Sequence, residues 1–323
     1  MKNFKHRTAL YAIPWASLFI GWLLGVSAGE NSETLGAWLL LASALLFGLP
    51  HGAYDFWILS DATRGETKRW LALGKILAAY LLLALFIGGV WYFLPSIALI
   101  SFLALTAWHF GSGDAIWESD VKLEWFLNSV GRGLLIVSAP LAFHPQDSAF
   151  VFSKLDANAS EILIYFAPYT LAVGMLLLLL TDLTGLFQKT NFQRQFSGRL
   201  ETLFLLLFFW LTTPLLAVTV YLVGVHSWRH LLRLEIYERN ELNSKIDGLW
   251  GNIGRFHGRA LPLTVLSLIG AALIIWLLQL RVSDLADQTS AYLILLSALT
   301  VPHAALITRT ELKRQKSPDI YQI

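Results

Sequence analysis

The stretch ILIYFAPYTLAVGMLLLLLTDLT at 162–184 contains a single charged residue, Asp182, within a long apolar run. A helix needs about 20 predominantly apolar residues to cross the hydrocarbon core of a bilayer. Nine other segments have a similar character, so the sequence predicts an all-α, polytopic membrane helix bundle of about ten transmembrane helices, within a range of eight to ten. The expected spans are 9–27, 35–59, 70–94, 95–111, 126–143, 162–184, 200–212, 214–231, 260–280 and 289–308.

The composition agrees with a membrane protein. Of the 323 residues, 56% are hydrophobic and only 14% are charged, whereas soluble domains carry about 25% charged residues. No basic block with interleaved aromatic residues occurs, so we expect no nucleic-acid partner. The chain has no cysteine, which excludes disulfides, a thiolate-ligated haem and cysteine-held iron–sulfur clusters.

Two features decide how the chain is divided. The apolar stretch 200–231 is interrupted at Thr212-Thr213-Pro214, where proline would break or bend a helix, so two spans are expected there. The basic N-terminus leads into an apolar run longer than a signal-peptide core, and we expect a retained first helix. We expect one membrane-embedded catalytic domain over 1–323, ending in a basic cytoplasmic tail at 309–323.

The distribution of lysine and arginine predicts the orientation, because cytoplasmic loops carry the excess. With ten spans, the basic segments fall on one side, and only the acidic segment 112–125 departs from the pattern. We therefore expect a multi-pass protein of the cell (inner) membrane with both termini in the cytoplasm. The basic segments are the N-terminus, 61–69, 185–199, 232–259 and the C-terminal tail.

Five of the eight histidines lie in apolar runs and, in this topology, in the cytoplasmic half of the membrane. A titratable ring at membrane depth is costly and usually functional, and neutral imidazole is a common ligand of iron, copper and zinc. The sequence therefore predicts one metal site. The candidate ligands are His51, His109, His226, His230 and His303.

Two carboxylates accompany these histidines. Asp55 follows His51 by four residues in the segment Gly48-Leu49-Pro50-His51-Gly52-Ala53-Tyr54-Asp55, and along one helix it would share a face with that imidazole. It is expected to orient the ring, although a kinked helix with a simple His–Asp pair is an alternative. Asp114 follows His109 and two glycines that suggest a turn, and it would orient an imidazole or cap the next segment.

The pair His226 and His230 has the spacing by which one helix offers two ligands to one metal, about 6 Å apart along the axis. Residues snorkelling to the interface are the alternative. His303 follows Pro302 as His51 follows Pro50, and it is a ligand or a polar residue facing the bundle. Aromatic residues flank the histidines and would line an apolar tunnel for a long hydrocarbon, or simply pack the helices. They are Phe47, Tyr54, Trp57, Trp108, Phe110 and Trp228.

A site rich in imidazole and poor in carboxylate suits a non-haem ferrous centre that binds O2. The sequence has no HExxH, phosphate loop or dinucleotide fingerprint. Three other readings stay open: a membrane desaturase or hydroxylase of the histidine-box type, a haem-binding electron carrier, and a transporter with broken helices. A retinal-binding rhodopsin is disfavoured because the last two spans contain no lysine.

Together these motifs resemble the signatures of the Brp/Blh family of membrane β-carotene 15,15′-dioxygenases, from about residue 40 to 310. The resemblance implies central cleavage of β-carotene with O2 to two retinals for a microbial rhodopsin, with Fe2+ on His51, His109, His226 and His230. The chain departs at Phe56-Trp57, where many members carry another histidine. The motifs are Pro50-His51-Gly52-Ala53-Tyr54-Asp55, Trp108-His109-Phe110-Gly111-Ser112-Gly113-Asp114, Arg132-Gly133, Pro140, Phe143-His144-Pro145, His226-Ser227-Trp228-Arg229-His230 and Pro302-His303.

Overall fold

The computed structural model describes residues 2–43, 49–62, 67–115, 122–188, 192–232, 249–277 and 285–314. In these ranges all regular elements are helices, which confirms the predicted all-α class. Seven helical stretches are long and apolar enough to cross a membrane, so the expected count of about ten is not confirmed. They are Tyr11–Ser43, Arg69–Phe93, Pro95–Ala115, Lys122–Phe143, Ala157–Thr184, Pro214–Leu232 and Asp287–Leu306.

The chain divides into two compact units, which are described separately. Unit 1 is made of residues 1–40 and 99–230, and unit 2 of residues 41–98 and 231–322. The expectation of one catalytic domain concerns function, and this division does not decide it.

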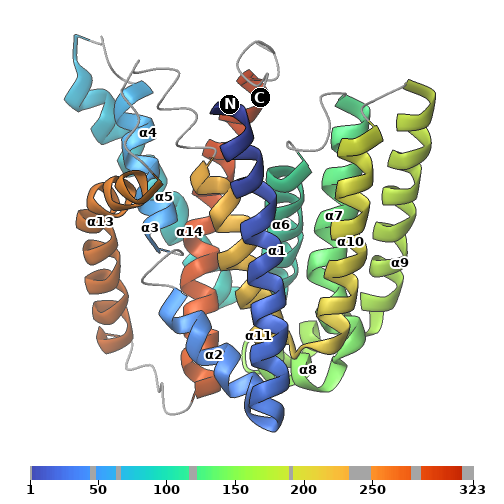
Figure 1. The fold of residues 1–323 in the computed structure, drawn as a ribbon. Coiled ribbons are helices and arrows are strands. Elements are labelled where there is room, and N and C mark those ends of the chain that lie inside the picture. The colour runs from blue at the N-terminus through green and yellow to red at the C-terminus, as the bar shows by residue number, and fades with distance from the viewer. Residues whose placement is uncertain are drawn as a thin grey trace. The chain divides into compact units, whose positions relative to one another are not determined.

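Unit 1 contains most of the long helices. Within it, α7 packs along α9 and against α10, while α1 packs against α11 and η3 (Figure 1). The elements are α1 (Lys2–Ala28), η1 (Gly29–Asn31), α2 (Ser32–Ser43), most of α6 (Pro95–Ala115), α7 (Lys122–Phe143), α8 (Pro145–Ser153), α9 (Ala157–Gln188), α10 (Phe192–Leu211), α11 (Pro214–Tyr221) and η3 (Leu222–Ser227), after which the helix continues to Leu232.

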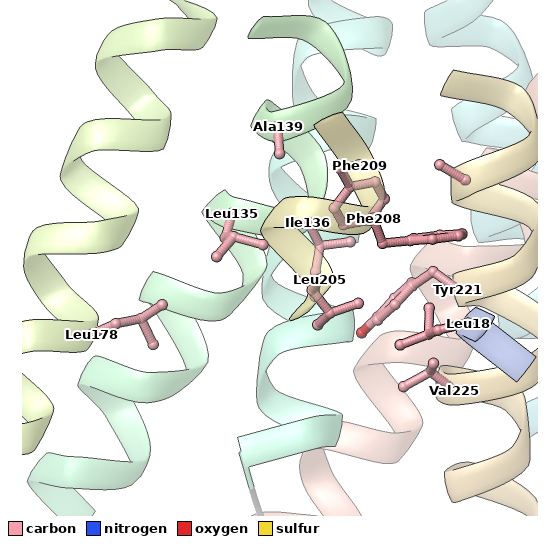
Figure 2. Close-up of a cluster of buried hydrophobic side chains, with 11 residues drawn as sticks. Leu18, Leu135, Ile136, Ala139, Leu178, Leu205, Phe208, Phe209, Tyr221 and Val225 are labelled. Carbon is pink, nitrogen blue, oxygen red and sulfur yellow. The ribbon is translucent and has the colours of Figure 1, made fainter. Parts of the chain in front are cut away.

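The core of unit 1 gathers apolar side chains from α1, α7, α9, α10, α11 and η3 (Figure 2). In a membrane, helix association depends on close packing, because lipid tails are as apolar as leucine. The members, all at most 2% exposed, are Leu18, Leu135, Ile136, Ala139, Leu178, Leu205, Phe208, Phe209, Ala217, Tyr221 and Val225.

Helices α6 and α7 approach each other closely at two glycines. A Cβ on Gly111 would lie 1.8 Å from the carbonyl oxygen of Ser129, and one on Gly133 would lie 1.9 Å from that of Ala107. The predicted turn after His109 is therefore wrong, since α6 continues to Ala115. The glycine allows backbone contact with α7 instead, as small residues do in membrane helix pairs.

The predicted interruption at Pro214 is confirmed. α10 ends at Leu211, Thr213 is extended with ψ of 149°, and α11 begins at Pro214. Proline is harmless in the first turn because the amide it lacks would have no partner within the helix.

Unit 2 contains α3 (Leu49–Ala53), α4 (Asp55–Ala62), α5 (Arg69–Phe93), α13 (Leu249–Leu277) and α14 (Leu285–Arg314). α14 packs along α5, where Trp91 Nε1 donates to Ser297 Oγ at 2.5 Å, and α3 packs against α13. Within the expected span 35–59, the structure describes α2 as far as Ser43, then α3, and Tyr54 forms a turn between α3 and α4. Of the predicted tail, residues 309–314 belong to α14, and the rest lies outside the described residues.

Candidate metal centre

Two of the predicted ligands meet inside unit 1. α6 carries His109 and η3 carries His226, and their Nε2 atoms lie 3.2 Å apart. The rings are 6% and 2% exposed. Two imidazole nitrogens that point at each other in a buried place either share a proton or share a cation.

The donor set at this pair fits a metal ion. Metal–imidazole bonds are about 2.1 Å long, so two ligands at octahedral or tetrahedral angles have nitrogens roughly 3.0–3.4 Å apart. The observed 3.2 Å falls between these values, and it also fits an N–H···N hydrogen bond in metal-free protein. The spacing of the pair thus suits one shared ion and equally suits a hydrogen bond.

The third histidine of unit 1 follows a local irregularity of the helix. Residues Leu222–Ser227 form a π-helical turn, and a regular helix resumes at Trp228. Such turns occur frequently at functional sites. The ring of His230 stacks 6.5 Å from that of His226, with an interplanar angle of 18°, and is 1% exposed. The two rings therefore face the same buried region, as their spacing predicts.

In unit 2, Asp55 holds His303. The Nδ1 atom of His303 lies 2.9 Å from both carboxylate oxygens of Asp55, and the hydroxyl of Tyr80 donates to Oδ2 at 3.2 Å. Metal-binding histidines commonly donate their second ring N–H to a carboxylate, which fixes the tautomer and the ring orientation. This arrangement suits a ligand role for His303. Its contact with Asp55 was not predicted, because it joins residues 248 positions apart.

The expected partner of Asp55 was His51. The backbone of His51 lies in α3, but its side chain lies outside the described residues. Among the described residues, no group of three or more histidine, aspartate or glutamate side chains is arranged to hold an ion. The structure places His109 beside His226, and His230 beside His226, in unit 1, and it places His303 in unit 2. The complete ligand set stays a prediction.

Phe110, one of the predicted substrate-binding aromatics of unit 1, contacts the histidine pair. Its ring centroid is 4.5 Å from that of His226 and 6.0 Å from that of His109. Trp108 instead packs edge-on against Trp125 at 5.6 Å. Trp228 is buried. Phe110 is thus placed to border a site at these histidines.

The aromatics of unit 2 make contacts with α13. Tyr54 stacks on Phe256 with centroids 5.0 Å apart and accepts a hydrogen bond from Arg259 at 3.2 Å. Trp57 Nε1 donates to the carbonyl oxygen of Arg259 at 3.0 Å. These contacts are those of helix packing, and the predicted substrate role of the two residues stays a prediction. Phe47 lies outside the described residues.

Asp114 belongs to a group of buried charges that sequence reasoning missed. Its Oδ2 accepts hydrogen bonds from Arg132 Nε at 3.1 Å and from the hydroxyl of Tyr221 at 2.8 Å. Glu201 and Arg229 complete the group. The sequence does contain a sign of this group, because Arg132 and Glu201 lie within predicted apolar spans.

The fold and the buried imidazoles define a polytopic membrane protein with histidines buried among its apolar helices. Comparison with known proteins gives the family. A family model described as beta-carotene 15,15′-dioxygenase matches residues 42–310, and the chain belongs to this family.

Two curated relatives are similar over nearly their whole length. One, from Halobacterium salinarum, is described as a probable beta-carotene 15,15′-dioxygenase Blh. It is 29% identical over 314 residues, which cover 92% of this chain and 90% of the relative. The other, from an uncultured marine bacterium, is described as a beta-carotene 15,15′-dioxygenase and is 30% identical over 84% of this chain and 92% of its own length. No solved structure matches.

Proposed function

We propose that this protein cleaves β-carotene at its central 15,15′ double bond with O2, releasing two molecules of all-trans-retinal. Each carbon of the broken bond receives one oxygen atom, so a single O2 supplies both carbonyl groups and no reductant is needed. The observation that supports this most is the buried pair His109 and His226, with Nε2 atoms 3.2 Å apart, in a chain of the β-carotene 15,15′-dioxygenase family.

Non-haem Fe2+ is the proposed cofactor. His51, His109, His226 and His230 would hold it, with His303 as a candidate fifth ligand. When bound, ferrous iron supplies the activation of O2. A donor set made of neutral imidazoles supports this choice, since imidazole suits iron and can leave coordination positions open.

The side chains of the protein have three tasks in this proposal. Asp55 keeps a proton on Nδ1 of His303 and so fixes its tautomer. Phe110, beside both imidazoles, excludes water and presents an apolar ring to the polyene. Holding the central bond of a long conjugated chain in one place is a matter of orientation, which contributes much of the rate in such reactions.

The location of the protein follows from its substrate. β-Carotene dissolves in the bilayer, and the multi-pass helices reach it there. We place the protein in the cell (inner) membrane with both termini in the cytoplasm. Retinal released into the same bilayer would be available to a microbial rhodopsin.

Expression in a β-carotene-producing bacterium tests the activity. The protein should bleach the orange cells and yield retinal, which chromatography identifies. His226→Ala should keep the cells orange, whereas the control His257→Ala, at a histidine of α13 outside the proposed ligand set, should bleach them. Apocarotenals of other lengths would move the cleaved bond, and unchanged β-carotene with well-expressed protein would refute the proposal.

The iron content of purified protein tests the cofactor separately. One iron per chain is expected, and His51→Ala should lower it. Two irons per chain would favour a histidine-box desaturase or hydroxylase, and a Soret band would favour a haem protein. Full iron content together with full retinal output from His51→Ala would remove His51 from the ligand set.

A further inference from the structure

Four buried charges form a closed cluster inside unit 1. Arg229 donates to both oxygens of Glu201, at 2.8 and 2.5 Å, and Arg132 bonds to Glu201 and to Asp114. Arg229 Nη1 also lies 3.3 Å from Asp114 Oδ2. The four side chains are at most 3% exposed. Two positive and two negative charges cancel, which is the condition under which buried charges are tolerated.

The cluster is attached to the histidine segments at two points. Arg229 lies between His226 and His230 in the sequence, on the helix that follows the π-helical turn. Asp114 lies on α6, five residues after His109. The ion pair between Arg229 and Asp114 therefore joins the helix carrying one imidazole to the helix carrying the other two.

Tyr221 makes a second connection between the same two segments. It is the last residue of α11, directly before the π-helical turn, and its hydroxyl donates to Asp114 Oδ2 at 2.8 Å. Asp114 thus bonds to Tyr221, which precedes His226 in the chain, and to Arg229, which follows it. These two contacts fix how far α6 lies from the turn that carries His226.

Glu201 on α10 and Arg132 on α7 hold Arg229 and Asp114 in position. Glu201, on α10, binds the guanidinium of Arg229 through two oxygens, and such bidentate pairs fix orientation as well as distance. Arg132, on α7, holds Asp114 and Glu201 together. Neither residue touches an imidazole in these bonds, and each acts through a residue next to the histidines in the chain.

We infer that Glu201 and Arg132 are positioning residues of the metal centre, which act through Arg229 and Asp114 to keep His109 and His226 at metal-binding distance. The inference rests on the proposed metal-binding function. It extends that function to a pair of charges on α7 and α10, neither of which supplies a ligand.

Cobalt binding to the full-length protein in detergent tests this inference. Co2+ is the probe because its visible absorption reports the ligand geometry, and binding is measured on protein stripped of metal by a chelator. Glu201→Gln should weaken the Kd for Co2+ by about 10–100-fold, the range seen when partners that orient metal ligands are lost, and should alter the cobalt spectrum. Elution volume and helical content should match the wild type.

A matched control removes a different ion pair on the same helix. Arg199 of α10 pairs with Asp182 of α9, where both side chains are partly exposed. Asp182→Asn should leave the Kd and the cobalt spectrum unchanged. A change in this control equal to that of Glu201→Gln would overturn the inference, because it would show a general effect of loosening α10.

Tyr221→Phe provides a milder variant in case Glu201→Gln does not fold. It removes only the hydroxyl that donates to Asp114 and should weaken the Kd for Co2+ by about 3–10-fold, as expected for one lost hydrogen bond. Wild-type affinity and spectrum in Glu201→Gln, or in Tyr221→Phe where the first variant fails to fold, would overturn the inference. Wild-type protein that binds no Co2+ or Fe2+ would instead refute the proposed metal centre itself.

Discussion

Replacement of Gly111 by alanine should push α6 away from α7 and disturb the histidine pair. The new Cβ would lie 1.8 Å from the carbonyl oxygen of Ser129, whereas real Cβ atoms almost never approach closer than 3.0 Å. The backbones must therefore part by about 1.2 Å, and overpacking of this kind costs about 1–3 kcal/mol. His109 precedes Gly111 by two residues on α6 and moves with it. A misplacement of about 1 Å at reacting groups can cost about 100-fold in rate.

The assay measures two quantities on detergent-solubilised protein: the initial rate of retinal formation from β-carotene and the temperature of unfolding. Both should fall in Gly111→Ala. Gly88→Ala is the matched control, because Gly88 lies on α5 with nothing within 4 Å of the added Cβ, and alanine favours the helix by about 1 kcal/mol. A Gly111→Ala protein within twofold of wild type in rate, with an unchanged unfolding temperature, would refute the close approach of α6 and α7.

Three further predictions concern the metal and unit 2. A chelator should abolish retinal formation, and Fe2+ should restore it while Zn2+ should not, as initial rates would show; activity that survives removal of all metal would contradict the proposed centre. Tyr80→Phe removes a hydrogen bond to Asp55 worth about 1 kcal/mol, so the rate should drop about fivefold, and an unchanged rate would mean that Asp55 needs no such support. Trp57→Phe loses the donor to the Arg259 carbonyl, so the protein should unfold about 1 kcal/mol more easily with its iron content unchanged; reduced iron would instead connect Trp57 to the site.

Hydropathy and proline positions were sufficient to predict the helical class and the end of α10 before Pro214, because both depend on properties of the local chain. The two glycines after His109 indicate a turn in the sequence, whereas the tertiary structure shows that Gly111 lies against the backbone of α7. Glycine serves turns and close packing equally well. Sequence alone could not separate the two uses.

The candidate site was predictable as a set of histidines but not as a set of contacts. The pairing of His303 with Asp55 joins α14 to the start of α4, and no periodicity relates residues so far apart in the chain. α3 ends at Ala53 and α4 begins at Asp55, and the side chain of His51 lies outside the described residues, so the predicted pairing of His51 with Asp55 stays a prediction. The buried charges were overlooked because a single charged residue in or beside an apolar run gives no indication of its partner.

The charge cluster also has a consequence for the way the chain enters the bilayer during synthesis. Asp114 and Arg132 lie on the consecutive helices α6 and α7, and Glu201 and Arg229 lie on either side of the break at Pro214. A lone charge at the centre of an inserting helix costs about 2.5–3.5 kcal/mol. The charges of Asp114 and Arg132 cancel, and so do those of Glu201 and Arg229, so pairing within each set would lower this cost before all four residues have met.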